Sequence, residues 1–155
     1  KIDKAAREGN PDAIDFPRGK IEDSPYDFSF SGLKSCVLNY INHAKMTGGE
    51  IRVPDLAASF QHSVVDSLVS RTIAAAREYG YRKVAIAGGV ASNSALRAGM
   101  KAACRKAGLT LYYPSPIFCT DNAAMIGVAG YYEYMKGNVS GWDLNAVPNL
   151  KLGER

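Results

Sequence analysis

Long apolar runs are absent from this sequence. None approaches the ~20 residues that a helix needs to cross a bilayer, so we expect no membrane association. The three cysteines, Cys36, Cys104 and Cys119, lie far apart and form no C-x-x-C pair. Their spacing indicates neither a disulfide framework nor a zinc ribbon. Reduced thiols in a cytoplasmic protein are the simpler interpretation.

Histidine is also scarce, and the motifs of several hydrolase classes are missing. His43 and His62 are the only histidines, and they form neither an H-x-x-x-H nor an H-E-x-x-H pair. No nucleophile elbow of the G-x-S-x-G type occurs. A zinc protease is therefore not indicated. We interpret both histidines as structural or solvated, and we assign no catalytic residue within this chain.

The charge that is present is mildly positive. The 155 residues carry a net charge of +4 and have a pI of about 9.0, which suits an anionic partner without demanding one. The basic residues of the middle of the chain cluster loosely, and helical spacing could equally place them on a solvated face. They are Arg71, Arg77, Arg82, Lys83, Arg97, Lys101, Arg105 and Lys106.

The first half of the chain predicts two helices and a strand. The opening nine residues have the character of a helix end that Gly9 closes, so we expect the chain to be a piece of a longer protein. A short strand over 26–30 has one aromatic face, and a helix capped by Ser31 follows it. A long helix with Pro54 in its first turn ends at Gly80. Its expected buried positions are Leu56, Phe60, Val64, Leu68 and Ile73.

The second half alternates between strand and helix. Its expected elements are strand 83–87, helix 92–107, strand 109–113 and helix 121–136. Strand, helix and strand in succession predict a right-handed crossover with parallel pairing, hence an α/β fold. In such sheets ligands bind beyond the carboxyl ends of the strands. The loops 88–93 and 114–121 should both reach that edge.

The first of these loops, Gly88 to Asn93, joins a buried strand to a helix N-terminus. Paired glycines permit positive φ and let a ligand approach the backbone, and a helix start suits a phosphate. Asn93 has an amide N–H for a phosphoryl or ribose oxygen. The alternative is a tight turn in which Ser92 or Asn93 only caps the helix. The turn is neither G-x-G-x-x-G nor a P-loop.

Asp121 lies in the second loop, just before the last predicted helix. It is either an N-cap or first-turn carboxylate, or a ligand for a cation or a general base. A single carboxylate cannot hold a catalytic metal, because such a site needs about three protein ligands.

Three segments carry motifs that go further: Phe28 to Lys34 (FSFSGLK), Gly88 to Arg97 (GGVASNSALR) and Cys119 to Gly127 (CTDNAAMIG). In this order they closely resemble the tRNA N6-adenosine threonylcarbamoyltransferases, a family once labelled O-sialoglycoprotein endopeptidase or glycoprotease. Residues 57–61 (AASFQ) and 146–150 (AVPNL) match as well. The resemblance covers nearly the whole chain, and it is closer to the bacterial than to the archaeal members of the family.

The resemblance implies an α/β, actin-like/hexokinase/Hsp70-type (ASKHA) fold of two lobes. Residues 1–155 would be a single domain, most of the second, C-terminal lobe, with the N-terminal lobe absent. The family moves a threonylcarbamoyl group from threonylcarbamoyl-AMP to N6 of the tRNA adenosine 3′ of the anticodon (t6A biosynthesis). Implied partners are tRNA, threonylcarbamoyl-AMP or ATP, a paralogous partner subunit and the small ATPase of the bacterial system.

The resemblance also implies roles for four residues. Asn93 would contact the adenylate, and Gly88 and Gly89 would form the turn that faces it. Asp121 would be one ligand of a divalent metal ion, iron or zinc. The family's metal-binding H-x-x-x-H motif and its serine-glycine-rich loop belong to the first lobe and are missing here. We therefore expect an incomplete metal site and a fragment that is inactive alone.

Two other classes remain open. One is the ATP-binding lobe of a kinase or chaperone of the same superfamily, which phosphate loops in the missing lobe would reveal. The other is a noncatalytic paralogous partner, against which Asp121 argues because a scaffold does not need that carboxylate.

Overall fold

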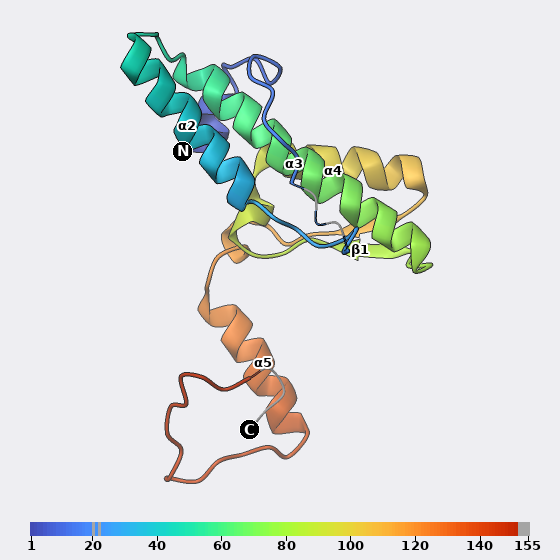
Figure 1. Ribbon diagram of the computed structural model, residues 1–155. Helices are drawn as coiled ribbons and strands as arrows, with labels where there is room; N and C mark the ends of the chain where they lie inside the picture. Colours follow the sequence, from blue (N-terminus) through green and yellow to red (C-terminus); the bar gives the residue numbers. More distant parts are fainter. Residues whose placement is uncertain (20, 22, 152–155) are drawn as a thin grey trace. The chain divides into compact units, whose positions relative to one another are not determined.

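The computed structural model describes residues 1–19, 21 and 23–151 and divides into two compact units, residues 1–120 and 121–155 (Figure 1). In chain order the first unit has α1 (Ile2–Ala6), α2 (Ser31–Thr47), α3 (Val53–Glu78), β1 (Lys83–Ala85), η1 (Gly89–Ser92), α4 (Ser94–Ala107), β2 (Thr110–Tyr112) and η2 (Pro116–Phe118). The second unit contains α5 (Ala123–Met135).

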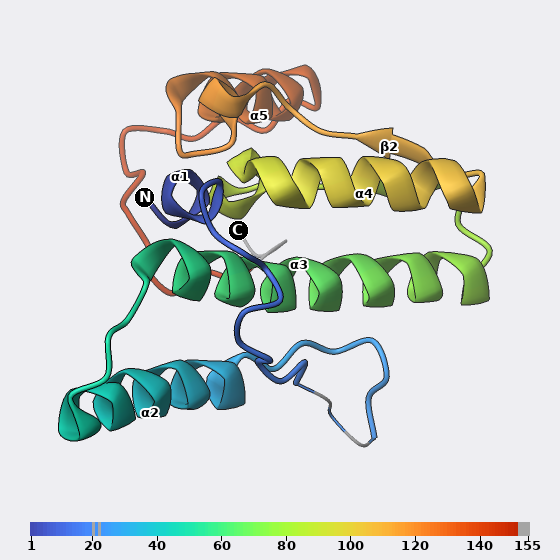
Figure 2. The ribbon, with the colours of Figure 1, turned by 90° about the horizontal axis from the view of Figure 1, so that it is seen from above.

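β1 and β2 pair in parallel, with Val84 opposite Leu111. The predicted parallel pairing and the α/β class are therefore confirmed, although each strand is shorter than the sequence suggested. Figure 2 shows α3 running between α2 and α4. Helix α4 supplies the crossover between the strands, as the alternation of elements predicted.

A small core forms where α3, α4 and β1 meet. Its buried members are Ala76 of α3, Val84 of β1, and Leu96, Met100 and Cys104 of α4. The three α4 residues recur every four positions, so they share one face of the helix. Burial raises the pKa of the Cys104 thiol, which favours its neutral form and a packing role.

Glycines end the long helices as predicted, but the predicted glycine end of the short helix α1 is not found. Gly48, Gly80 and Gly108 follow α2, α3 and α4 with φ of 69°, 70° and 69°, in the left-handed region that glycine tolerates best. The predicted cap at Gly9 is wrong, because α1 ends earlier, at Ala6, and Gly9 has no positive φ. A Cβ on Gly9 would lie 2.0 Å from the carbonyl oxygen of Pro54. Glycine at this position lets the loop pass close to the start of α3.

The predicted strand over residues 26–30 does not form. Phe28 and Phe30 stack on one another with ring centroids 6.2 Å apart, and the guanidinium of Arg71 lies 5.8 Å from the Phe28 centroid. The alternating aromatic residues therefore reflect packing of side chains rather than a hydrogen-bonded ladder. The predicted cap at Ser31 is displaced by one residue, because α2 begins at Ser31 itself and its cap position is Phe30.

The buried face of α3 also differs from the prediction. The expected apolar stripe is half-buried rather than buried, whereas Ser59, Ser63 and Ser67 are exposed by only 1%, 2% and 4%. Ser59 accepts a hydrogen bond from the backbone N–H of Ile14 at 3.1 Å, and Ser63 donates to the carbonyl of Phe16 at 3.1 Å. Because buried backbone groups need partners, this serine stripe takes the place that apolar side chains were expected to occupy.

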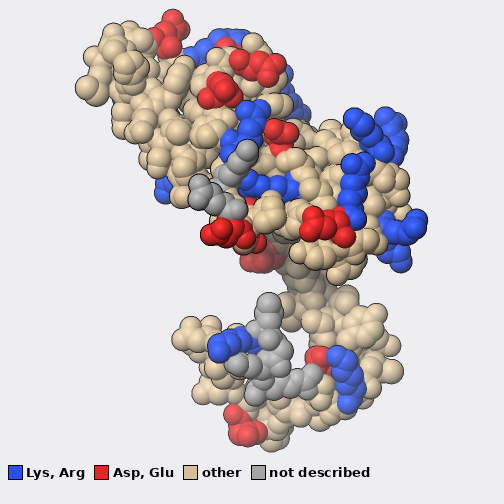
Figure 3. Space-filling model, turned by 45° about the vertical axis from the view of Figure 1, so that its right-hand side comes forward, with Lys and Arg blue, Asp and Glu red and all other residues tan. Residues whose placement is uncertain are grey.

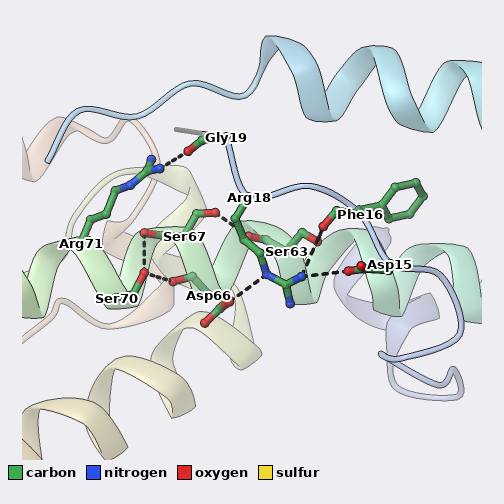
Figure 4. A network of polar contacts seen from close by, with 9 residues as sticks. All are labelled: Asp15, Phe16, Arg18, Gly19, Ser63, Asp66, Ser67, Ser70 and Arg71. Atoms are coloured by element: carbon green, nitrogen blue, oxygen red, sulfur yellow. Dashed lines mark hydrogen bonds and ion pairs between the residues drawn. The ribbon is translucent and has the colours of Figure 1, made fainter. Parts of the chain in front are cut away.

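Figure 4 shows how the same loop is held farther along α3. Arg18 donates to the carboxylate of Asp66 at 2.9 Å and to that of Asp15 at 3.1 Å. Arg71 donates to the carbonyl of Gly19. The segment from Asn10 to Gly19 is thus tied to α3 by side chains of the helix.

In the second unit, α5 begins one residue after Asn122, whose Oδ1 accepts a hydrogen bond from the backbone N–H of Met125 at 3.1 Å. No residue of this helix is buried. Within the described part of the chain, no helix combines the length and apolarity that crossing a membrane requires.

Candidate functional site

The turn after β1 has the open backbone that the glycine pair predicted. Gly88 adopts φ 83° and ψ 172°, a conformation that is essentially confined to glycine. Gly89 begins η1 and has no positive φ. A Cβ built on either glycine would meet no atom within 4 Å. Gly88 is therefore needed for its conformation, whereas Gly89 leaves free space beside the backbone.

Asn93 uses both ends of its amide. Its Oδ1 accepts from the backbone N–H of Leu96 at 2.9 Å, so it is the N-cap of α4, as one of the two predictions had it. Its Nδ2 donates to Oε1 of Gln61 at 2.7 Å. An amide nitrogen carries two hydrogens, so one donor of Asn93 remains beyond these two contacts. Capping and ligand contact are thus compatible roles for this residue.

Gly89 and Asn93 line a pocket of about 620 Å³ in the first unit. Its wall is mostly apolar, and a few polar groups converge on it, which is the usual composition of a small-molecule site. The other lining residues come from α1 and the residue before it, and from α3, η1 and α4: Lys1, Ile2, Asp3, Phe60, Gln61, Val64, Val65, Leu68, Val90, Ser92 and Leu96.

The N-terminus of α4 already holds an anion, the carboxylate of Asp3. The hydroxyl of Ser94 donates to Asp3 at 2.7 Å. Burial raises the pKa of Asp3, but hydrogen bonds from the side chain and backbone of Ser94, together with Arg7, outweigh it and hold this pKa below its usual value. The position that a phosphate would use at this helix start is therefore occupied by the protein itself.

Arg97 connects the two loops at the carboxyl ends of the strands. Its Nε donates to the carbonyl of Ala91 at 2.5 Å, and its Nη2 donates to the carbonyl of Pro114 at 2.8 Å and to Sγ of Cys119 at 3.2 Å. The guanidinium also lies 4.8 Å from the ring centroid of Tyr113. The predicted meeting of the loops after β1 and β2 is thus confirmed up to Cys119.

Asp121 belongs to the second unit and is not the cap of α5, because Asn122 occupies that position. The capping prediction for Asp121 is therefore wrong. Among the described residues, no group of three or more His, Cys, Asp or Glu side chains is placed to hold a metal ion. His43 and His62 are both exposed, in keeping with their interpretation as solvated residues.

Sequence reasoning missed two residues of this site. Gln61 lies on α3, 32 positions from its partner Asn93, and only its place in the AASFQ segment singled it out. Arg97 was counted among the loosely clustered basic residues, although its side chain is bound within the fold. The GGVASNSALR segment contains it, so motif membership was a better signal than charge.

Comparison with known proteins supplies a family. A family model described as tRNA N6-adenosine threonylcarbamoyltransferase matches residues 1–128. Proteins of that name from Clostridium beijerinckii and Clostridium botulinum (strain Kyoto) are 55% and 57% identical over 155 residues, and one from Clostridium kluyveri is 56% identical over 156 residues. Each comparison covers 100% of this chain and 46% of the relative, so the chain spans less than half the length of the proteins it matches.

Proposed function

Because the chain belongs to the tRNA N6-adenosine threonylcarbamoyltransferase family, we propose that it is part of an enzyme that transfers a threonylcarbamoyl group from threonylcarbamoyl-AMP to N6 of a tRNA adenosine. Residues 1–155 would be a single domain, most of the second lobe of a two-lobed actin-like enzyme. It would act in the cytoplasm beside a paralogous subunit and a small ATPase.

The pocket lined by Gly89 and Asn93 carries this proposal. Its apolar wall, with Phe60, Val64 and Val90, suits the faces of a nucleoside, and the remaining amide hydrogen of Asn93 suits a ribose or phosphoryl oxygen. The ligand in this pocket would be the adenylate of threonylcarbamoyl-AMP or ATP.

The charges around the pocket orient that ligand. The carboxylate of Asp3 at the start of α4 would repel a phosphate, so the phosphate would lie instead against the Gly88–Gly89 backbone. The absence of side chains at both glycines permits that approach.

The described residues do not form a complete site for the metal ion of the proposed enzyme, iron or zinc. Asp121 would supply one oxygen ligand, and the described residues provide no further cluster around it. The other ligands would come from the remainder of the longer protein. Such an ion, when bound, would polarise the carbamoyl carbonyl. The fragment alone would then be inactive.

Threonylcarbamoyl transfer to tRNA, measured with a longer protein that contains this sequence, tests the proposal. Gly89→Ala should leave the melting temperature unchanged and raise KM for the nucleotide by about 10-fold, roughly 1.4 kcal/mol of lost binding, because a methyl group enters the ligand's space. Gly32→Ala is the matched control, since a Cβ there also meets nothing within 4 Å, and Gly32 lies outside the pocket. Absence of transfer by the longer protein would reject the proposed function. An unchanged KM in Gly89→Ala would reject the pocket as the nucleotide site.

A further inference from the structure

Positive charge is concentrated in one part of the sequence. Residues 71–120 contain eight Lys or Arg and one Asp or Glu, a net charge of +7, whereas the rest of the chain has a net charge of −3. The weak overall charge of +4 thus conceals a strongly basic segment. Such segregation produces a local field that attracts anions over several ångströms.

Two of the eight basic side chains are used within the fold, and six are not. Arg71 and Arg97 bind backbone carbonyls. The other six are exposed and make no hydrogen bond or ion pair with the described residues: Arg77, Arg82, Lys83, Lys101, Arg105 and Lys106. We call these six residues the basic face.

Although Lys101 lies in the middle of α4, the fold brings the other five residues of the basic face together at one end of the first unit. The carboxyl-terminal ends of α3 and α4 and the amino ends of β1 and β2 meet there, since Thr110 donates to the carbonyl of Arg82 at 2.9 Å and pairs with Lys83. Figure 3 shows Lys and Arg side chains gathered along the right-hand edge of this unit. The acidic residue of the segment, Glu78, accepts a hydrogen bond from Tyr26.

Helix electrostatics explains only part of this arrangement. Arg77, Arg105 and Lys106 lie in last helical turns, where the helix dipole favours cations. Lys83 lies in a strand and Arg82 in the connection before it, so neither gains from a helix end. Helix electrostatics therefore does not account for these two cations, which extend the positive charge beyond the helix ends.

Exposed tyrosines beside these cations favour RNA over other anionic surfaces. Tyr79 and Tyr81 are 65% and 66% exposed, and they are the only exposed large hydrophobic side chains in ranges 77–85 and 101–110. Aromatic rings next to basic residues suit unpaired bases flanked by phosphates. A membrane-binding surface commonly adds exposed Leu, Phe or Trp that insert between lipids, and these ranges lack such side chains.

We propose that the basic face binds the phosphate backbone of an RNA, with Tyr81 stacking on an unpaired base. The proposal rests on the proposed function, and it assigns the part of the chain that holds the RNA substrate. Along α4, Arg105 and Lys106 lie about 18 to 20 Å from Asn93, or about six base steps of a duplex, and Lys101 lies nearer, at about 12 Å. One folded RNA can therefore contact the basic face while another part of it approaches the pocket.

Fluorescence anisotropy with an anticodon stem-loop RNA, at 50 to 200 mM salt, tests the proposal on the full chain and on the longer protein. Each lost phosphate contact reduces the slope of log K against log salt by about 0.7 to 0.9. The triple variant Lys83→Gln, Arg105→Gln, Lys106→Gln should therefore lower the slope by about 2 to 3. Between these salt concentrations, the unchanged protein should lose about 30-fold more affinity than this variant. Tyr81→Ala should weaken binding at least about 5-fold without altering the slope.

The matched control changes three exposed lysines outside the basic face, Lys4, Lys34 and Lys45, to Gln, and so removes the same net charge. An equal loss in both triple variants would show that only net charge matters and would overturn the proposal. The proposal would also be overturned if the protein bound a DNA hairpin of the same sequence, or vesicles rich in phosphatidylserine, as tightly as the RNA, and if the triple variant lost the same affinity for them. Normal transfer with an unchanged salt slope would reject the basic face alone, whereas a reduced slope without transfer would reject only the proposed function.

Discussion

Arg97 donates a hydrogen bond to Sγ of Cys119 at 3.2 Å, and this contact closes a ring of interactions around the loop after β2. The thiol in turn donates to the carbonyl of Ser115 at 3.6 Å, and Cys119 is only 2% exposed. The arginine reaches the turn after β1 through Ala91. One side chain of α4 thereby fixes the separation of the two loops that follow the strands.

Loss of Arg97 should loosen the loop after β2. Arg97→Ala removes hydrogen bonds made by a charged donor, so we expect the free energy of unfolding in urea to fall by about 2 kcal/mol. Arg97→Lys keeps the charge but not the planar fork, and it should restore little of that loss. After treatment with iodoacetamide, mass spectrometry should find Cys119 alkylated in the Arg97→Ala variant but not in the unchanged protein. The exposed Cys36 is the internal reference, because it should be alkylated in both.

Arg105→Ala is the control for this prediction, because the Arg105 side chain is exposed and makes no hydrogen bond or ion pair with a described residue. Its unfolding free energy should change by less than about 0.5 kcal/mol. Equal stability of the Arg97→Ala and Arg105→Ala proteins would show that the arginine does not hold the loop.

Asn93→Ser separates capping from ligand contact. Serine caps a helix about as well as asparagine, so the free energy of unfolding should change by less than about 1 kcal/mol. The variant loses the amide donors that face Gln61 and the pocket, so its affinity for ATP in the longer protein should fall by about 10-fold, measured by calorimetry. Asn122→Ser, which replaces the cap of α5, serves as control and should keep full affinity. Unchanged affinity in Asn93→Ser would leave Asn93 as a cap only.

The elements of α/β character were predictable because they depend on local signals. The αL glycines Gly48, Gly80 and Gly108 and the first-turn Pro54 mark helix ends through backbone sterics alone. The serine stripe of α3 was not predictable, since nothing in the periodicity shows that a loop 45 residues away needs partners for its backbone. The roles of Gln61 and Arg97 in the site were not predicted for the same reason, because their hydrogen-bond partners are brought close only by the tertiary fold.

Asp121 and Asn122 should have separable effects in the longer protein. Asn122→Ala removes the oxygen that caps α5 and should cost about 1 kcal/mol of stability. Asp121→Asn and Asp121→Ala leave that cap in place, so both should keep the melting temperature of the metal-free protein. They should lose bound metal and threonylcarbamoyl transfer, because neither variant keeps the anionic carboxylate oxygen that would bind the dication. Full metal content in Asp121→Asn, measured by atomic emission, would remove Asp121 from the metal site.

Asp3 should make the stability of the first unit depend on pH in the acidic range. Its pKa is lowered in the folded state, so its contribution is complete above the unfolded value of 3.8 and is lost as pH falls through the folded pKa. The melting temperature of the unchanged chain should therefore drop more steeply below about pH 4 than that of Asp3→Asn. The two curves should approach one another near pH 2. Parallel curves throughout would mean that the contact with Ser94 contributes nothing to stability.

Two buried serines of α3 form hydrogen bonds with main-chain atoms of the loop that follows α1, and this determines which positions can change during evolution. Ser59 binds the N–H of Ile14 and the carbonyl of Asn10, and Ser63 binds the carbonyl of Phe16. Every residue type except proline offers the same N–H, and every type offers the same carbonyl. Drift in the identity of Ile14 should thus be tolerated, whereas Ser59 and Ser63 should resist replacement. In a saturation library, positions that contribute only backbone atoms to these hydrogen bonds should accept many residue types. Positions that contribute the side chain should accept few.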